Sequence, residues 1–167
     1  MRRRDDGSFV EFVELRGSAL LRTAQLMCGT RHDAEDVLQT ALEKAYRHWG
    51  RLDDSVDPEP YVRKILVNLV ISRARRWKIL REIHMARLPE VPASGPDMEL
   101  RGALLAELQA LGPRQRAVLV LRYWEDLSEH ETAELLGCSV GTVKSQASRA
   151  LTRLRSRLDG DLALQRG

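Results

Sequence analysis

Aromatic residues are scarce in this chain of 167 residues, at 5% of the composition, and cysteine occurs only twice. The apolar run between Ile65 and Ile71 is interrupted by Asn68. It is far shorter than the roughly 20 residues that a membrane-spanning helix needs, so no membrane insertion is expected. No stretch alternates apolar and polar residues long enough to indicate a β-strand. Leucine, alanine, arginine and glutamate recur throughout, and the fold class is therefore predicted to be all-α.

Cys28 and Cys138 lie far apart in the sequence and show no spacing typical of metal ligands. The pattern favours small, partly buried residues in a reducing cytoplasm over a redox switch. The 4 histidines are scattered as well, so neither a metal site nor a cofactor is predicted. A nuclease or a deaminase would need clustered carboxylates or a Cys/His set, and the chain is not expected to be an enzyme.

Positive and negative side chains nearly balance, with 27 Lys and Arg against 24 Asp and Glu and a net charge of +3. Such a balance neither demands nor excludes nucleic acid as a partner. Local basic and acidic faces instead indicate two kinds of partner on one chain. The basic residues at 2–4 are followed by Asp5 and Asp6 and not by an apolar segment. No signal peptide is therefore predicted, and the protein is expected in the cytoplasm.

The stretch from Leu127 to Leu158 predicts two helices joined by a tight turn. Ser128 and Glu131 have the Ser-x-x-Glu spacing of a capping box, which begins the first helix. Gly137 ends that helix, because a glycine tolerates the positive φ of a tight turn. Ser139 can then cap the second helix. These local signals predict a helix-turn-helix, the common reader of duplex DNA.

The second helix of this pair has two chemically different faces. Ala133 and Val143 are the small and apolar residues expected where the two helices touch. Its inward face is predicted from helical spacing to be Val143, Ala147, Ala150, Leu151, Leu154 and Leu158. Its outward face carries the candidate DNA contacts, namely Ser139, Val140, Thr142, Lys144, Ser145, Ser148 and Arg149. Residues 139–158 include basic side chains and no acidic one, as expected of a helix beside phosphates. An ordinary antiparallel helix pair could share these features.

Two amphipathic helices are predicted near the N-terminus. A capping box at Ser8 and Glu11 is expected to begin the first, and Gly29 to end it. Thr30 can cap the second, which is expected to end before Gly50. The polar face of the second helix offers Asp33, Asp36, Gln39, Thr40, Glu43 and Lys44, which solvation alone could explain.

The segment from Arg51 to Pro60 is polar and holds two prolines, so a loop of about ten residues is expected. The third helix, near Tyr61 to Ile83, has an apolar start and a cationic end that includes Arg73, Arg75, Arg76, Lys78 and Arg81. Trp77 lies among these charges. It either stacks on a base of single-stranded nucleic acid or belongs to the core, and both interpretations stay open here.

A proline-rich stretch without helical periodicity, from Leu88 to Asp97, predicts a linker. Two small helical domains are therefore expected, at residues 8–83 and 97–160, joined by a flexible linker at residues 84–96. Within the second domain, one helix is expected to stop at Gly112 and another to run from Pro113 to near Trp124. The last residues, from Gly160, are expected to fray, with no further domain after them.

Four segments, in the right order, resemble the extracytoplasmic-function (ECF) sigma factors, the small bacterial type that keeps regions two and four of the sigma-70 family. The matching segments are DAEDVLQ at 33–39, YVRKILVNLVISRARR at 61–76, LGPRQRAV at 111–118 and GTVKS at 141–145. Four motifs in order are far more specific than one. The phrase RYWEDLS at 122–128 is similar to actinobacterial members, which suggests an actinobacterial source. Ser72 and Gln146 depart from the common pattern, so promoter details do not carry over.

The resemblance implies a subunit that brings core RNA polymerase to promoter DNA, without catalysis of its own. Contact with the β′ clamp helices would involve Asp33, Asp36, Gln39 and Glu43. Capture of the melted minus-10 strand would involve Arg51, Asn68, Arg73, Arg75, Arg76 and Trp77. The helix from Ser139 would read the minus-35 element, and the linker would run toward the RNA exit path. Further implied partners are the β flap of the polymerase and an anti-sigma factor that clamps both domains.

A second hypothesis is a stand-alone transcription regulator that binds duplex DNA through its helix-turn-helix. Its N-terminal helices would then serve dimerisation or ligand sensing. Such a regulator gives no reason for a polar face at Asp36 and Gln39 joined to a basic helix that carries Asn68. The N-terminal region therefore discriminates between the two hypotheses.

Overall fold

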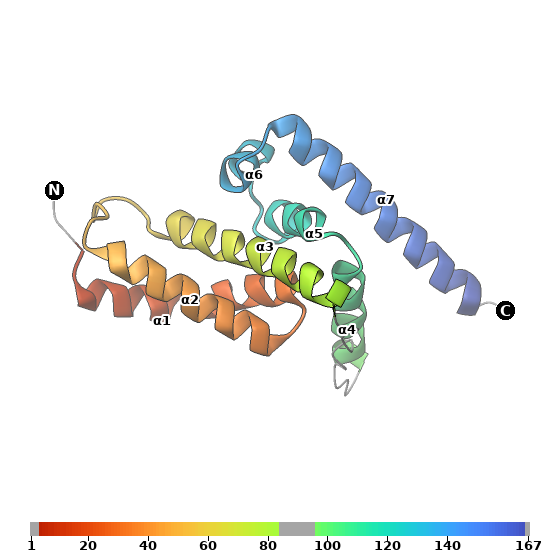
Figure 1. Cartoon of the computed structure of the whole chain (residues 1–167), viewed down its shortest axis with the longest axis horizontal. Helices are drawn as coiled ribbons and strands as arrows, with labels where there is room; N and C mark the ends of the chain where they lie inside the picture. The colour runs from red at the N-terminus through yellow and green to blue at the C-terminus, as the bar shows by residue number, and fades with distance from the viewer. Residues whose placement is uncertain (1–3, 84–95, 166–167) are drawn as a thin grey trace. The chain divides into compact units, whose positions relative to one another are not determined.

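The computed structural model describes residues 4–83 and 96–165, with side chains at 4–79 and 102–160. Within these ranges every regular element is a helix, which confirms the all-α prediction (Figure 1). The chain divides into two compact units, Met1–His84 and Met85–Gly167. The predicted linker lies outside the described residues except for Pro96, which begins a helix.

The first unit is formed by three helices that pack against one another (Figure 1): α1 (Asp6–Cys28), α2 (Arg31–Trp49) and α3 (Glu59–Ile83). As predicted, α1 ends at Gly29, whose φ of 86° is left-handed. The hydroxyl of Thr30 accepts a hydrogen bond from the Asp33 amide at 3.1 Å and caps α2. Since a β-branched or bulky residue is strained at positive φ, glycine suits the tight connection between the two helices.

The predicted capping box at Ser8 is wrong. The helix begins earlier, and the carboxylate of Asp5 accepts the Ser8 amide at 2.8 Å as its N-cap. Asp5 lies one turn before Ser8 and is an equally strong capping residue, so the helix begins one turn earlier, and the Ser8 amide bonds to Asp5 and not to the Glu11 side chain that a capping box would use. The Ser8 hydroxyl is thereby left to bond elsewhere, to the Asp5 carbonyl at 2.8 Å and to the Trp49 ring nitrogen at 3.0 Å.

The core of the first unit is built from the apolar faces that the helical spacing predicted. Its side chains with no exposed surface include Ala24, Ala34, Ala41, Ala45, Val62, Leu66 and Val67. Alanines on α1 and α2 let the two backbones approach closely, while Trp49, 2% exposed, closes one end of the bundle. Close packing of this kind gives the helices fixed relative positions, because interiors are as dense as organic crystals.

The third helix starts sooner than the sequence suggested. The Asp57 carboxylate accepts the Glu59 amide at 3.0 Å, so α3 begins at Glu59 and Pro60 occupies its first turn. Proline is well tolerated there because the first amides of a helix have no partner within the helix. The loop therefore spans residues 50–58 and is shorter than predicted.

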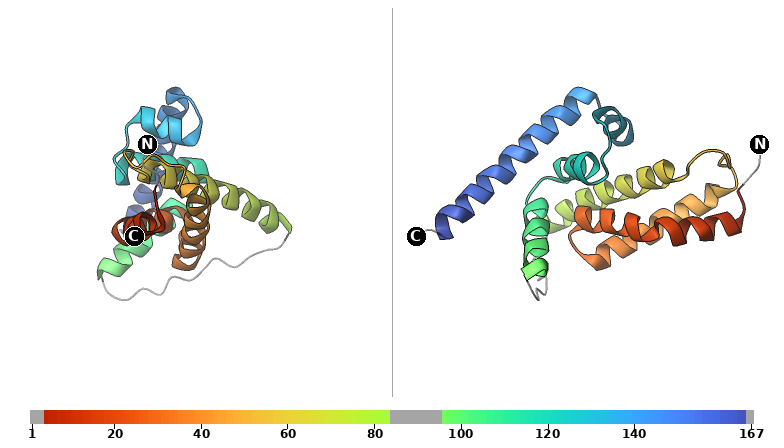
Figure 2. Two further views of the ribbon diagram at one scale, coloured as in Figure 1. Left: turned by 90° about the vertical axis from the view of Figure 1, so that its left-hand side faces the viewer. Right: turned by 180° about the vertical axis from the view of Figure 1, so that it is seen from behind.

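The second unit contains the remaining elements (Figure 2): α4 (Pro96–Gln109), α5 (Pro113–Leu119), the π-helix η1 (Val120–Trp124), α6 (Glu129–Leu136) and α7 (Val140–Gln165). Both α5 and α6 pack against α7. The sequence did not predict the π-helical turn, and it did not predict that α7 continues past Gly160 to Gln165. Leu158, expected to face inward, is 52% exposed, because the described part of α7 continues past the helices that cover its inner face.

Arg116 joins α4 to α5 from a buried position. Its guanidinium donates to the carbonyls of Leu108, Gln109 and Leu111 at 2.8, 3.2 and 3.0 Å, at the end of α4. The last carbonyls of a helix have no partner within it and carry partial negative charge, so a cation satisfies both needs. At 8% exposed, Arg116 is the one charged side chain classed as buried among the described residues.

Both cysteines are free and half-buried, as the sequence suggested.

Candidate functional site

The helix-turn-helix forms as predicted, from local hydrogen bonds. The Ser128 hydroxyl accepts the Glu131 amide at 3.1 Å, and the Glu131 carboxylate accepts the Ser128 amide at 2.7 Å. Gly137 ends α6 with a φ of 64°. The Ser139 hydroxyl then accepts the Thr142 amide at 3.1 Å and caps α7. The start of α6, its end and the start of α7 are therefore each fixed by residues close together in the sequence.

Packing between α6 and α7 uses the positions that the pattern identified. Val143 and Ala150 have no exposed surface and Ala133 is 4% exposed. Ala147, Leu151 and Leu154 are half-buried on the same side of α7. The seat of α7 on α6 and α5 is thus apolar, and it leaves the polar side of α7 to the solvent.

The candidate DNA contacts lie together on this polar side. Ser139, Lys144, Ser145, Ser148 and Arg149 are exposed, while Val140 and Thr142 are half-exposed. The ammonium group of Lys144 lies 3.6 Å from the Glu129 carboxylate of α6. This ion pair is exposed, so it is worth little and can be exchanged for a phosphate. The amino-terminal turn of α7 also presents the positive end of the helix dipole.

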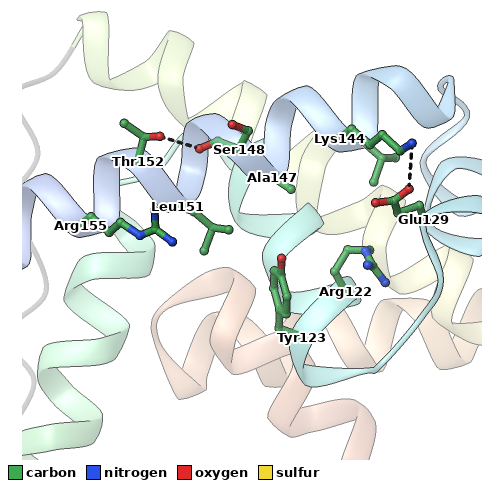
Figure 3. A pocket seen from close by; sticks show the side chains of 10 residues that line it. Arg122, Tyr123, Glu129, Lys144, Ala147, Ser148, Leu151, Thr152 and Arg155 are labelled. Atoms are coloured by element: carbon green, nitrogen blue, oxygen red, sulfur yellow. Dashed lines mark hydrogen bonds and ion pairs between the residues drawn. The ribbon is translucent and has the colours of Figure 1, made fainter.

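A groove of about 390 Å³ follows the same helix (Figure 3). Three cationic side chains line it, Arg122 of η1 and Lys144 and Arg155 of α7, beside the single carboxylate of Glu129. In Figure 3 the side chains of Arg122 and Tyr123 rise from η1 toward α7. A concave surface with three positive groups suits a phosphodiester backbone.

Sequence reasoning missed Arg122, Tyr123 and Arg155 in this groove. The segment before Glu125 was expected to be an ordinary helix, whereas η1 has the wider π geometry that is frequent at functional sites. No local sequence pattern distinguishes the two helix types. Asp126, in the turn that follows η1, adopts a φ of 54°. Asp and Asn adopt this backbone conformation more readily than other residues with a side chain.

The other candidate surface is the polar face of α2. Asp36, Gln39 and Glu43 recur at helical spacing, and the Gln39 amide donates to the Glu43 carboxylate at 3.4 Å. Gln39 and Glu43 also border an apolar groove of about 420 Å³ between α1 and α2, lined by Phe9, Leu21, Leu38, Leu42 and Tyr46. The face therefore combines acceptors with exposed apolar surface, the composition typical of a protein interface.

Asp33, the fourth acceptor of this face, is hydrogen-bonded to two other side chains of the unit. Its carboxylate accepts a hydrogen bond from the Thr30 hydroxyl at 2.7 Å and another from the Arg73 guanidinium at 2.9 Å. Arg73 also lies 3.6 Å from Asp36. The structure thus brings together two residues that the resemblance assigned to different partners, Asp33 to the polymerase and Arg73 to DNA.

The predicted minus-10 residues are spread along α3 and the loop before it. Arg51 is exposed in the loop, while Trp77 lies 18 residues beyond the first residue of α3. At about 1.5 Å per residue, Trp77 lies roughly 27 Å along the helix from the first residue of α3. Asn68 and Arg75, seven positions apart, are exposed on one face between them. A strand that contacts all of these residues would follow the length of α3.

The carboxyl end of α3 is cationic and exposed. Arg75, Arg76 and Lys78 are exposed, and Trp77 is 45% exposed. The interpretation of Trp77 as a core residue is therefore wrong, because this part of α3 extends past the helices that cover its first turns. An exposed tryptophan among arginines is suited to stacking on a nucleobase.

The loop at residues 50–58 is held by short-range bonds. The Asp53 carboxylate accepts the Ser55 amide at 3.1 Å and the Ser55 hydroxyl at 2.9 Å. These bonds, the backbone one foremost, hold the pKa of Asp53 below its ordinary value, and the charge of Arg4 acts in the same direction. Val56, at the loop's tip, is 60% exposed.

Over the described side chains, no three His, Cys, Asp or Glu residues gather as metal ligands would. Nor does any helix in the same part of the chain have the length and apolar character to cross a membrane.

The helix-turn-helix with its cationic outer face defines a DNA-binding protein. Residues 12–78 match the family Sigma-70 region 2, and residues 101–154 match Sigma-70, region 4. The RNA polymerase sigma-E factor of Streptomyces coelicolor is 41% identical over 154 residues, which span 90% of this chain and 85% of that protein. The ECF RNA polymerase sigma factor SigW of Bacillus subtilis is 27% identical over 92% of this chain and 90% of its own length.

Solved structures agree on the fold. The sigma factor RpoE of Bartonella quintana, crystallised with the anti-sigma factor NepR, superposes with a TM-score of 0.70 at 24% identity. The match covers 91% of this chain and 97% of that one.

The chain belongs to the extracytoplasmic-function sigma factors of the sigma-70 family. It is an alternative sigma factor, which directs RNA polymerase to promoters for transcription initiation. The Streptomyces relatives agree with the expected actinobacterial source. Nothing among these relatives supports the hypothesis of a stand-alone regulator.

Proposed function

We propose that the two units bind different partners. The first unit binds core polymerase and the melted promoter strand, and the second unit binds duplex promoter DNA. The observation that carries this proposal is the division of chemistry between them. The first unit combines an acceptor-rich face on α2 with a cationic, aromatic end on α3. The second unit offers a helix-turn-helix whose exposed face carries no acidic residue from 139 to 158. The protein acts in the cytoplasm and performs no catalysis of its own.

Core polymerase contacts Asp36, Gln39 and Glu43. Asp33 stabilises this face through its hydrogen bond from Arg73 of α3. Carboxylate and amide oxygens on a rigid helix suit arginine-rich partner helices, since charge-assisted hydrogen bonds are strong and orient a complex. The apolar groove beside Gln39 and Glu43 adds hydrophobic area to the same contact. The β′ clamp helices are the proposed occupant of this face, and the β flap is the proposed partner of the second unit.

Promoter DNA is contacted at two places. The minus-35 duplex meets the amino-terminal half of α7, where Thr142, Lys144, Ser145 and Arg149 reach bases and phosphates. The melted non-template strand of the minus-10 element follows α3 from the loop at 50–58, past Asn68, to Arg75, Arg76 and Trp77. Extruding a base from its stack costs a few kcal/mol, and stacking on Trp77 with phosphate contacts to the arginines offsets that cost.

An anti-sigma factor is a further proposed partner. The similar sigma factor RpoE of Bartonella quintana was crystallised with the anti-sigma factor NepR, and the structurally similar CnrH is known in complex with the cytosolic domain of CnrY. A protein that covered the polar face of α2 and the cationic face of α7 together would block polymerase and DNA at once.

The core-binding assignment is tested with a double variant, Asp36→Ala with Gln39→Ala, in a fluorescence binding assay against core polymerase. Removing one or two charge-assisted bonds, worth about 1.5–3 kcal/mol, should weaken binding roughly tenfold or more. Glu14→Ala is the matched control, because it removes an exposed carboxylate from α1. Equal affinities of the double variant and the unaltered protein would refute the assignment.

A further inference from the structure

Arg4 lies against the loop at residues 50–58, far from it in sequence. Its guanidinium donates hydrogen bonds to two backbone carbonyls of this loop, those of Asp54 and Val56. It also lies 5.2 Å from the ring centroid of Trp49, where a cation–π interaction is favourable. One side chain therefore binds both the last residue of α2 and the tip of the loop that follows.

The segment that carries Arg4 is itself anchored. Tyr46 donates to the Asp6 carboxylate at 3.0 Å, and the Trp49 ring nitrogen donates to Ser8 at 3.0 Å. The Phe9 ring packs against both aromatic rings, with centroids 5.0 Å apart in each case. The start of α1 is thereby fixed on the end of α2, so the position of Arg4 relative to the loop is set by the core of the unit.

The loop's other bonds explain why this anchor matters. The bonds of Asp53 to Ser55, and of the Val56 amide to the Asp53 carbonyl at 3.2 Å, each span two or three residues. Such bonds shape a turn, and the Arg51 and Leu52 amides fasten only the start of the loop to α2, through the His48 and Trp49 carbonyls at 2.9 and 3.0 Å. The contacts of Arg4 span 50 and 52 residues and tie the turn to the helices. A turn held in this way has lost much of its conformational entropy before any ligand arrives.

We propose that Arg4 is a positioning residue for promoter opening: it holds the loop at 50–58 in the shape that receives an unpaired base of the non-template strand. The inference rests on the proposed role of this loop in minus-10 capture. The Nη2 group of Arg4 donates to both carbonyls of the loop, so the proposed effect of Arg4 on strand capture is exerted through the loop. Its loss leaves core binding and minus-35 recognition intact and weakens strand capture alone.

The test uses full-length Arg4→Ala and Arg4→Lys proteins assembled with core polymerase, on a promoter identified from transcripts that rise when the protein is overproduced. Hydrogen exchange of the amides at 50–57 reports the order of the loop, with the amides of α2 as a fold control. Open complexes are followed by 2-aminopurine fluorescence in the non-template strand of the minus-10 element. Core affinity is measured in parallel, and Arg22→Ala, which removes an exposed arginine from α1, is the matched control.

We expect Arg4→Ala to speed exchange at 50–57 and to lower the open-complex yield, each roughly tenfold, because hydrogen bonds to charged groups are lost. Core affinity should stay within about twofold, since no residue of the α2 face is altered. Arg4→Lys should restore part of both losses, because an ammonium keeps the cation–π contact and one donor set. Unchanged exchange, or faster exchange with an unchanged open-complex yield, would overturn the inference.

A loop variant in which residues 53–56 are replaced by Gly-Ser-Gly-Ser separates this inference from the function it rests on. If the loop variant opens the promoter normally, the loop does not capture the strand, and both the minus-10 assignment and the role of Arg4 are wrong. If the loop variant fails while Arg4→Ala opens normally, only the role of Arg4 is wrong.

Discussion

Arg73 of α3 donates a hydrogen bond to the Asp33 carboxylate of α2 at 2.9 Å, and its guanidinium is 3.6 Å from Asp36. The side chains of Arg73 and Asp33 are each 32% exposed. The pair joins the helix proposed to bind polymerase to the helix proposed to bind the melted strand. Because Arg73 is already bonded within the protein, the exposed Arg75 and Arg76 are better placed to meet phosphates.

Arg73→Ala should therefore lower stability more than it lowers strand binding. The free energy of unfolding of the first unit should fall by about 0.5–1 kcal/mol, a modest figure because both partners are in reach of water. A double-mutant cycle with Asp33→Ala, measured by urea unfolding, should show that the two losses are not additive. Arg75→Ala should leave stability unchanged and weaken binding of a single-stranded oligonucleotide to the holoenzyme. The reverse ranking would mean that Arg73 is free to reach DNA.

Arg116→Met should destabilise the second unit. The substitution keeps most of the apolar volume but leaves the carbonyls at the end of α4 without their donor, at a cost of about 2–3 kcal/mol. Thermal and urea unfolding of the full chain would measure the change in the transition of this unit. Arg114→Met is the control, because Arg114 is exposed on the same helix. Similar losses in the two variants would show that the buried bonds add nothing.

Asp53 should titrate below its ordinary pKa of 3.8 in the folded protein. The bonds from Ser55 favour its carboxylate form, so their contribution to loop stability is complete above pH 3.8. It is lost as the pH falls through the lower pKa of the folded state. An NMR titration of the Asp53 carboxyl carbon would measure this midpoint. Ser55→Ala should move the midpoint partway upward because the hydroxyl bond is removed; an unmoved midpoint would contradict this cause.

Arg149→Ala should weaken binding of the holoenzyme to minus-35 DNA at every sequence tested if Arg149 meets a phosphate. Each phosphate contact contributes about 0.9 to the slope of log affinity against log salt, so the slope should fall by about one. Fluorescence anisotropy between 50 and 200 mM salt, roughly the range over which such slopes are measured, would provide the comparison. A loss confined to one base-pair position, with the slope unchanged, would instead identify Arg149 as a base reader.

The sequence predicted the features that depend on residues close together. Thr30, Ser128 with Glu131, Gly137 and Ser139 all cap helices as expected, because a cap is decided within three or four positions. The apolar spacing of α6 and α7 likewise identified Val143 and its neighbours as the seam of the helix-turn-helix. Local chemistry and helical period were sufficient for the fold class and for the exposed, polar side of α7.

Features that depend on distant residues were not predictable in this way. Arg4 and the loop are about 50 positions apart, as Arg73 and Asp33 are 40 apart, and no local pattern pairs them. The cap at Ser8 was misassigned for a local reason, because Asp5, three residues earlier, caps the helix equally well and accepts the Ser8 amide. Trp77 was ambiguous because its exposure depends on where α1 and α2 end beside α3, which hydrophobic spacing alone does not state.

The central claim is tested most directly by reconstituted transcription, with purified protein, core RNA polymerase and linear promoter DNA. The account predicts a transcript from a defined start site only when protein and core are both present. The isolated protein should bind the same duplex poorly, because the affinity of the holoenzyme for a promoter is shared between the two DNA-binding units and the polymerase. Tight, sequence-specific duplex binding by the isolated protein, with no transcript when core polymerase is added, would contradict it.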